Sequence, residues 1–216
     1  MWKQKEKSGK IWYELEFDSD TLVLQGTKTF DPLNEMEGIS CGLKQIHSAV
    51  IHKACSGITL VGDGIFTNEK NVVLYVKTAD CLPIILYYPK KILAILHAGW
   101  RGTLLRITKK FLIQMKNELK LSVPEWIVAF GVSIGRDNYE VGVEICELFK
   151  IERIPGVHIK ENNHFLDLKE ANMIEMKEMG ITTFYHFPEE TYSSAIFYSN
   201  RRGDKDRNIT VGRIVP

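Results

Sequence analysis

The sequence predicts an α+β fold in which mixed β-sheets, accompanied by few helices, form one domain over residues 1–216. Short apolar runs that are rich in β-branched residues recur along the whole chain and are separated by turn signals. Patterns of helical period are few, and the chain has no internal repeat, low-complexity tract or linker rich in proline or serine. These three observations favour a single sheet-based domain.

Composition and charge exclude several classes of protein. Hydrophobic residues make up 44% of the chain and charged residues 25%, which is ordinary for a protein that buries a core. The net charge of +1 offers no overall field for nucleic acid or an anionic membrane, although a local basic pocket stays open. The apolar runs are too short to span a membrane, and the start, MWKQKEKSGK, is no signal segment. We therefore expect a cytoplasmic protein without nucleic-acid or membrane partners.

The first third of the chain predicts several short strands. Alternating polar and apolar residues indicate strands at 11–17 and 21–25. The segment GLKQIHSAVIHKA predicts one or two more, in which a two-residue period would place Gln45 and His47 on one face. GITLVGDGIF then predicts a strand and a turn, with Asp63 at the strand end.

The segment 71–103 is the centre of the predicted site. Its three apolar runs, NVVLYVKT, PIILYYP and ILAILH, predict neighbouring strands, the last two joined by a short turn. Asp80 and Cys81 follow the first run, and His97 closes the last. Core strands do not require such residues at their ends, so we interpret the segment as a site on a rigid sheet.

The second half of the chain predicts both helices and strands. The clearest helix covers 101–119, where apolar residues recur at helical spacing from Leu104 to Leu119. A second helix is expected within NYEVGVEICELFK, and a third follows a short strand within HFLDLKEANMIEMKEMG. The remaining predicted strands are WIVAFGVSIG, ITTFYHF, SAIFYSN and NITVGRIV.

The four cysteines are scattered and include no Cys-x-x-Cys pair, so a disulfide framework is not expected. Cys41, Cys55 and Cys146 are interpreted as small buried hydrophobic residues. Cys81 differs from them because of its neighbours.

His47, Cys81 and His97 form a candidate metal site. Imidazole and thiolate are zinc ligands, and three protein ligands leave a fourth position open, as in catalytic sites. Their spacings of 34 and 16 residues match no local zinc motif, so hydrogen-bonded histidines beside an inert cysteine remain the alternative. Asp80 can orient a ligand, act on a substrate or cap a turn. Asp63 has the same alternatives, and its flanking glycines favour a structural role.

The stretch HAGWRGT is a candidate anion site, because it leads from a strand directly into the predicted helix. A glycine-bearing turn at a helix start offers free N–H groups to phosphate, and Arg101 can add a bidentate contact. The alternative is a tight turn whose glycines only relieve steric crowding. Arg201, in the basic stretch SNRRGDKDRN, can reach the same cleft if the preceding FYSN is a strand.

With these segments assembled, the chain resembles the YfiH-like laccase-domain family, whose members are called both polyphenol oxidase and purine nucleoside phosphorylase. The resemblance runs from about residue 44 to the C-terminus. It implies a layered fold with helices flanking two sheets (α/β/β/α), and a metal triad at His47, Cys81 and His97. The matching segments are KQIHSAVIH, VGDGIFTN, KTADCLPIILY, ILHAGWRGT, GVSIGRDNYEVGVEI, FLDLKEAN and FYSNRRGD with GRI.

The resemblance also implies an activity. Family members cleave adenosine, inosine and methylthioadenosine with phosphate, and they deaminate adenosine. The expected metal is zinc, with copper as the alternative, and the expected partners are a nucleoside and phosphate. The expected catalytic residues are Asp80, Cys81 and Arg101. The expected substrate-binding residues are Gln45, Asp63, Gly99, Trp100, Tyr139 and Arg201.

Several departures from the family pattern keep other functions open. The N-terminal third is shortened, Lys28 is the only base where the family has an arginine, and Val132 replaces a proline. One alternative is a hydrolase that edits cell-wall precursors, with Cys81 as nucleophile and His97 as base. A multicopper oxidase is disfavoured by six histidines without a His-x-His pair, which leaves weak copper-dependent phenol oxidation. A non-enzymatic metal-binding module is the last alternative. The sequence does not indicate an oligomeric state.

Overall fold

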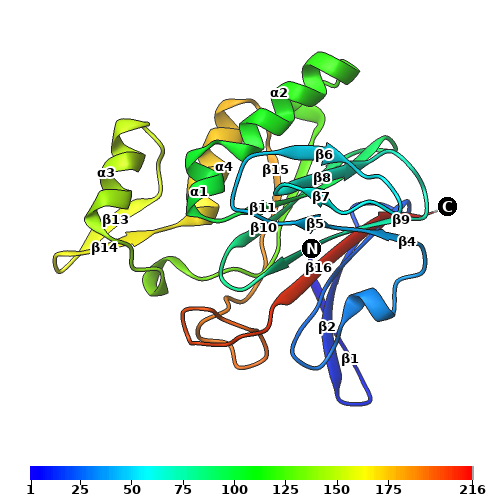
Figure 1. Ribbon diagram of the computed structural model, residues 1–216, viewed down its shortest axis with the longest axis horizontal. Coiled ribbons are helices and arrows are strands. Elements are labelled where there is room, and N and C mark those ends of the chain that lie inside the picture. The colour runs from blue at the N-terminus through cyan, green and yellow to red at the C-terminus, as the bar shows by residue number, and fades with distance from the viewer. Residues whose placement is uncertain (216) are drawn as a thin grey trace.

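Two six-stranded β-sheets dominate the computed structural model, which describes residues 1–215, so Pro216 of the predicted domain lies outside the described residues (Figure 1). The strands of the first sheet pair antiparallel except for β4, which runs parallel to β9 at one edge. In spatial order this sheet contains β1 (Lys3–Lys7), β2 (Lys10–Leu15), β3 (Thr21–Gln25), β16 (Asn208–Ile214), β9 (Val72–Thr78) and β4 (Ile39–Cys41).

The second sheet has an antiparallel centre and a parallel strand at each edge. Its strands are, in order, β15 (Thr183–Tyr185), β12 (Ile127–Phe130), β10 (Leu82–Tyr88), β11 (Ile92–Ala98), β8 (Gly64–Thr67) and β6 (Ile51–Lys53). Two small pairs complete the strands, namely β5 (Leu43–Lys44) with β7 (Leu60–Val61) and β13 (Val157–Lys160) with β14 (Asn163–Leu166). Mixed sheets with few helices confirm the predicted α+β class.

The two sheets pack face to face, and strand alternation decides which side chains they share. In β9, Leu74 and Val76 point into the layer between the sheets, where they pack with Ile85 and Ile95 of the second sheet. Val73, on the opposite side of β9, packs in a separate cluster on the outer face. That outer face is covered by the segment 26–38, which contains the short turn η1 (Pro32–Asn34).

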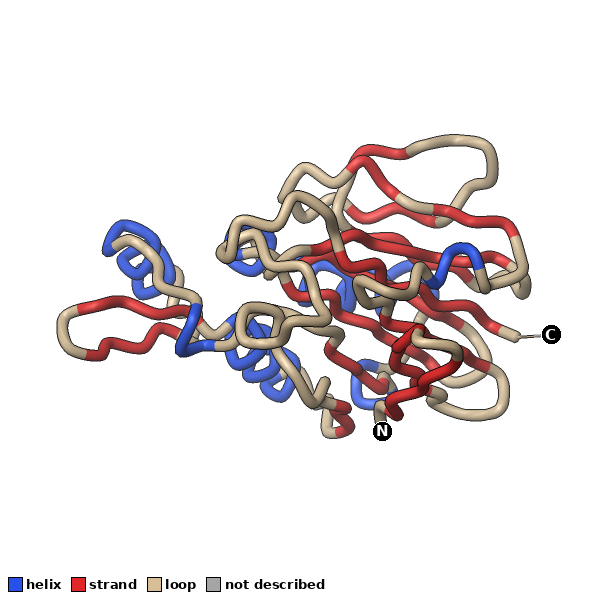
Figure 2. The backbone as a smooth tube through the Cα atoms, turned by 90° about the horizontal axis from the view of Figure 1, so that it is seen from below, coloured by secondary structure: helices blue, strands red, loops and turns tan. Residues whose placement is uncertain are grey.

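The helical layer lies on the outer face of the second sheet (Figure 1). Two helices, α2 (Ile107–Leu119) and α4 (Leu168–Glu178), pack there against the apolar side chains of β10 and β11. Helix α3 (Val143–Ile151) lies beside β13 and β14, and this unit projects from one end of the molecule (Figure 2). Two short turns connect these elements, η2 (Val123–Glu125) and η3 (Arg136–Asn138).

The predicted helix over 101–119 is divided in two, α1 (Trp100–Leu104) and α2. Arg106 separates them in the left-handed conformation, at φ 57°. Its guanidinium donates to Glu175 Oε1 at 2.6 Å and to the carbonyl oxygen of Glu152. Helical periodicity does not reveal a two-residue break of this kind, because the apolar positions on both sides still face the sheet.

Three further features differ from the predictions. SAIFYSN forms turns instead of a strand, because the side chain of Arg202 holds the carbonyl groups of this region, including those of Thr191 and Phe197. β1 was not predicted, since its five residues are polar and exposed at a sheet edge. Cys55, unlike Cys41 and Cys146, is exposed, so the prediction that it is buried is wrong.

Among residues 1–215, no helix combines the length and the apolar character that a membrane span needs.

Candidate metal centre

His47, Cys81 and His97 meet at one end of the second sheet. Cys81 immediately precedes β10, and His97 lies in β11, where Pro83 pairs with His97 and Leu82 with Ala98. This antiparallel register brings the cysteine and the histidine together although they lie 16 residues apart in sequence. His47 comes from the connection between β5 and β6. The ligand atoms of the three residues all lie within 4.8 Å of one another.

Asp63 orients His97. It is fully buried, and its Oδ1 lies 2.7 Å from His97 Nδ1. Burial opposes ionisation, but hydrogen bonds from His97 and Ser48 outweigh it and lower the pKa of Asp63 to about 2. An ionised carboxylate at this distance holds a proton on Nδ1, so Nε2 is the nitrogen that would give up its proton to bind a metal.

The same carboxylate also shapes the turn that carries His47. It accepts hydrogen bonds from the backbone N–H groups of Ile46 at 3.3 Å, His47 at 3.0 Å and Ser48 at 2.6 Å. The hydroxyl of Ser48 adds a fourth at 2.7 Å. His47 accordingly has a φ of 59°, which no strand residue adopts. One buried carboxylate therefore positions two of the three candidate ligands.

Gln45 and His47 do not share a strand face, contrary to the prediction from two-residue periodicity. β5 ends at Lys44, and the side-chain amide of Gln45 pairs with the backbone of Lys77 in β9. The amide nitrogen donates to the Lys77 carbonyl oxygen at 2.9 Å, and the amide oxygen accepts from the Lys77 N–H at 2.8 Å. Gln45, predicted to bind substrate, thus ties the His47 turn to the first sheet.

The neighbouring charges in the centre stabilise the ionised forms of Cys81 and His97. Burial would raise the pKa of the Cys81 thiol, but hydrogen bonds and positive charge from His47 and His97 lower it to about 7. Burial would lower the pKa of His97, but Asp63 and Cys81 raise it to about 9. The centre therefore favours a thiolate, which is the form that binds metals. His47 is exposed and Cys81 half-buried, whereas His97 is 3% exposed, so solvent reaches the centre from the His47 side.

The donor set fits a zinc- or copper-type ion. Two imidazoles and a thiolate are ligands of these metals, and three ligands leave a position for a substrate. The hydrogen bond between His97 Nδ1 and Asp63 Oδ1 orients the imidazole, as is usual for a histidine that binds a metal. Gly99 supplies room, because a Cβ there would lie 2.8 Å from Cys81 Sγ and 3.4 Å from His47 Cδ2.

Asp80 is joined to the segment that carries Arg201. It is 7% exposed and has a φ of 86°, and it directly precedes Cys81. Its Oδ1 accepts from the Thr191 hydroxyl at 2.5 Å, and its Oδ2 accepts from the Arg201 N–H at 2.7 Å. Both carboxylate oxygens are engaged, although no strand delivers Arg201 as predicted.

Tyr139 and Arg201 form an aromatic and cationic pair near Cys81. The Arg201 guanidinium lies 5.5 Å from the Tyr139 ring centroid and donates to the Glu140 carbonyl oxygen at 2.7 Å. Burial raises the pKa of Tyr139, and the negative charge of Cys81 raises it further. The pair offers a ring face and a positive charge beside the thiolate.

The turn from β11 into α1 provides the remaining predicted residues. Gly99 caps α1, which begins at Trp100. Arg101 is exposed, and its guanidinium carbon lies 4.2 Å from the centroid of the Trp100 ring. Ser48 and Thr191 were not predicted, because a lone hydroxyl has no pattern that reveals the carboxylate it will meet.

Comparison with known proteins places the chain in a family. Residues 18–215 match the family described as multi-copper polyphenol oxidoreductase laccase. The chain belongs to this family.

Individual relatives of the chain carry names other than laccase. A purine nucleoside phosphorylase of Rickettsia conorii is 30% identical over 192 residues, which cover 85% of this chain and 78% of the relative. The YlmD structure from Geobacillus stearothermophilus superposes with a TM-score of 0.88 at 22% identity, covering 99% of each chain. A Neisseria meningitidis structure of family DUF152 gives 0.84 at 21% identity, covering 95% of this chain and 99% of its own. The two structures confirm the fold.

Gly99→Ala is expected to weaken metal binding at the candidate centre about tenfold or more, because the new methyl group would displace the Cys81 sulfur. The backbone at Gly99, with φ −78° and ψ −177°, is open to alanine, so the fold should tolerate the change. Titration against a competing chelator measures the affinity. Gly135→Ala is the control, since its Cβ would meet only the flexible side chain of Glu190, at 3.3 Å. Equal affinities of the two variants would contradict the steric argument.

Proposed function

We propose that this chain is a metal-dependent purine nucleoside phosphorylase acting on adenosine, inosine and methylthioadenosine, with adenosine deamination as a second activity of the same centre. The observation that carries the proposal is the convergence of the His47, Cys81 and His97 ligand atoms within 4.8 Å, beside a turn that presents Arg101. The name of the Rickettsia relative supports a nucleoside and phosphate as substrates.

His47, Cys81 and His97 would hold the ion, and Asp63 would orient two of them through its hydrogen bonds. A bound zinc or copper ion would supply Lewis acidity and make water a stronger nucleophile near neutral pH. The exposed side of His47 is the open approach for a nucleoside. Asp63 has no free surface, so we assign it to positioning in place of the predicted contact with substrate.

Arg101 would bind phosphate. Its guanidinium is exposed and pre-oriented on Trp100, so it can present two parallel N–H groups to an oxyanion. Tyr139 and Arg201 would contact the nucleoside through the ring face and the guanidinium. During phosphorolysis the phosphate forms a bond to the anomeric carbon as the bond to the purine nitrogen breaks, and positive groups nearby stabilise the phosphate.

Asp80 was predicted as a general acid or base. Because both of its oxygens accept hydrogen bonds, from Thr191 and from the Arg201 backbone, we propose a positioning role for it. In this role it would fix the segment that carries Arg201 against the strand end that carries Cys81.

Incubation with adenosine or inosine, with and without phosphate, tests the proposal when the products are followed by chromatography. Phosphate-dependent release of adenine or hypoxanthine supports phosphorolysis, and inosine formed from adenosine without phosphate supports deamination. Absence of both reactions in metal-loaded protein would remove the proposal and favour a hydrolase or a non-enzymatic metal-binding module.

Arg101→Ala is expected to raise the KM for phosphate about tenfold or more, because a charge-assisted bidentate contact is lost. The KM for the nucleoside should change less. Arg136→Ala is the matched control, since Arg136 is exposed and pairs with Asp137 at 3.2 Å. An unchanged KM for phosphate in Arg101→Ala would exclude Arg101 from the phosphate site.

A hydrolase is the second candidate, favoured by the lowered pKa of Cys81 beside His97. A free thiolate would attack an amide or ester of a cell-wall precursor, with His97 handling the proton. Alkylation separates the two functions. A metal-bound Cys81 should resist iodoacetamide until a chelator is added, whereas a catalytic thiolate should react at once.

The family description suggests phenol oxidation as a third candidate activity. Within residues 1–215, His47, Cys81 and His97 are the only group of three or more His, Cys, Asp or Glu residues that could hold a metal ion. A multicopper oxidase needs ligands for several copper ions. We therefore expect at most weak phenol oxidation with copper in this one centre.

A further inference from the structure

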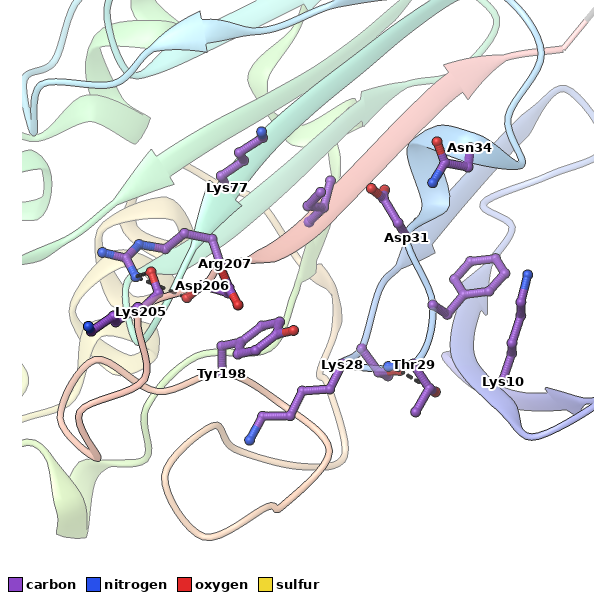
Figure 3. Close-up of a pocket in the computed structure, with 13 residues that line it drawn as sticks. Lys10, Lys28, Thr29, Asp31, Asn34, Lys77, Tyr198, Lys205, Asp206 and Arg207 are labelled. Atoms are coloured by element: carbon purple, nitrogen blue, oxygen red, sulfur yellow. Dashed lines mark hydrogen bonds between the residues drawn. The ribbon is translucent and has the colours of Figure 1, made fainter.

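A basic cavity lies on the outer face of the first sheet (Figure 3). Its volume is about 640 Å³, within the range of small-molecule sites. It is bounded by the segment 27–34 on one side and by Tyr198 and the segment 205–207 on the other, with Lys77 of β9 above them in Figure 3. The cavity is thus assembled from parts of the chain far apart in sequence.

Positive charge distinguishes this cavity from the rest of the molecule. Its lining contains five basic and two acidic side chains, an excess of three positive charges, whereas the whole chain has a net charge of +1. The basic residues are Lys10, Lys28, Lys77, Lys205 and Arg207. They belong to different segments of the cavity wall, so the lining as a whole has an excess of positive charge.

Three of these bases have no carboxylate partner among the described residues. Lys10 pairs with Glu35 at 3.3 Å, and Lys28 pairs with Asp204 at 3.5 Å. Within residues 1–215, no carboxylate oxygen lies within 4.0 Å of the charged nitrogens of Lys77, Lys205 or Arg207. Arg207 Nη1 donates instead to the carbonyl oxygens of Lys205 at 2.7 Å and Asp206 at 2.9 Å, which fixes the guanidinium while leaving its charge unneutralised.

The walls of the cavity are held in place. Asp31 uses its carboxylate to cap η1 by accepting from the Leu33 N–H at 2.9 Å. Tyr198 is fixed through Asn208, which accepts from the Tyr198 N–H at 2.8 Å and donates to its carbonyl oxygen at 2.7 Å. Lys28 lies 5.4 Å from the Tyr198 ring centroid. An anion entering the cavity would therefore meet positive charge on a backbone that is already ordered.

The cavity has no lining residue in common with the metal centre. Lys77 lies on the same side of β9 as Tyr75 and Val73, the side that faces away from the second sheet. Cys81 and His97 belong to the second sheet, and none of the proposed catalytic or metal-binding residues lines the cavity.

We propose that this cavity binds a small polyanion with two or more linked phosphate groups. Several cations around one space suit several charged oxygens, and lysine and arginine form their strongest hydrogen bonds with such oxygens. A single phosphate would contact only part of the lining, and a nucleic acid would need a positive surface that extends beyond one cavity. The linked phosphates can belong to an inorganic chain or to a nucleotide.

Calorimetric titration of the purified protein with sodium tripolyphosphate, and in parallel with ATP, tests the site at physiological ionic strength. Binding is expected. The double variant Lys77→Gln/Arg207→Gln should lower the affinity about tenfold or more, because it removes two charged hydrogen-bond donors. Lys110→Gln/Lys116→Gln removes the same charge from α2 and should leave the affinity unchanged. Equal tripolyphosphate and ATP affinities indicate recognition of the phosphates alone, and tighter ATP binding adds contacts to the nucleoside part.

Two further measurements distinguish this cavity from the metal centre as the source of the heat. Arg101→Ala should bind tripolyphosphate as the parent does, because Arg101 is outside the cavity lining. If Arg101→Ala abolishes binding, the anion occupies the metal centre and the inference is wrong. If the phosphates only removed metal from the protein, the heat would be unchanged in the double variant Lys77→Gln/Arg207→Gln. That result would also overturn the inference. Lys205→Gln/Arg207→Gln serves as the second test variant if the first one does not fold.

Discussion

Asp63→Ala is expected to lower the free energy of unfolding by about 3–5 kcal/mol, because it leaves five donors, one buried and four partly buried, without their acceptor. The backbone N–H groups of the His47 turn and the Ser48 hydroxyl all donate to this carboxylate. The metal affinity is expected to fall about tenfold to a hundredfold, since His97 loses the partner of its Nδ1. Denaturant unfolding of the metal-free protein and a chelator titration measure the two effects separately.

Asp63→Asn separates the two roles of this carboxylate. The amide keeps the shape and one acceptor oxygen, but its nitrogen would meet donors that the carboxylate now satisfies. Its effect on stability should be smaller than that of Asp63→Ala, while metal affinity should still fall. Asp31→Ala is the matched control, because this exposed aspartate accepts from Leu33 N and should cost only about 0.5–2 kcal/mol as a cap. Loss of metal affinity in Asp31→Ala would show that the assay reports general destabilisation.

Local pattern was sufficient where the side chains of a strand are apolar and mostly buried. The predicted strand over 21–25 coincides with β3, in which four of the five side chains are buried. The runs NVVLYVKT and ILAILH became β9 and β11, and β11, buried along its whole length, was recognisable as a nearly continuous apolar run. β1 could not be found in this way, because all five of its side chains are exposed and it is held by pairing with β2 alone.

The candidate metal centre could be predicted only through the family resemblance. Spacing alone left His47, Cys81 and His97 as one alternative among several, since residues on different elements have no local signature. Their convergence depends on the register of β10 and β11 and on the turn held by Asp63, which are both long-range features. The error about Gln45 and His47 has the same origin, because a buried carboxylate 16 residues beyond His47 decides the conformation there.

Cys81→Ala is expected to abolish both stabilisation by metal and phosphorolysis. In the parent protein, zinc at about a hundred times its dissociation constant should add about 2.7 kcal/mol to the stability, because it binds the folded state alone. The variant should show no rise in Tm on addition of zinc, because the thiolate is the only anionic ligand of the triad. Its Tm without metal should stay close to that of the metal-free parent, since Cys81 is half-buried at a strand end.

Cys55→Ser is the control for Cys81→Ala, because Cys55 is also a free cysteine but is exposed and is not one of the three candidate ligands. It should keep the full rise in Tm and full activity. Cys81→Ser adds a distinction between the candidate functions. A hydroxyl is a poor zinc ligand and a poor nucleophile at neutral pH, so phosphorolysis and hydrolysis should both be lost in this variant. Only the phosphorylase hypothesis requires that metal binding and nucleoside cleavage are lost together. A Cys81 variant that binds no zinc yet still cleaves inosine with phosphate would separate the metal from the reaction and refute the mechanism.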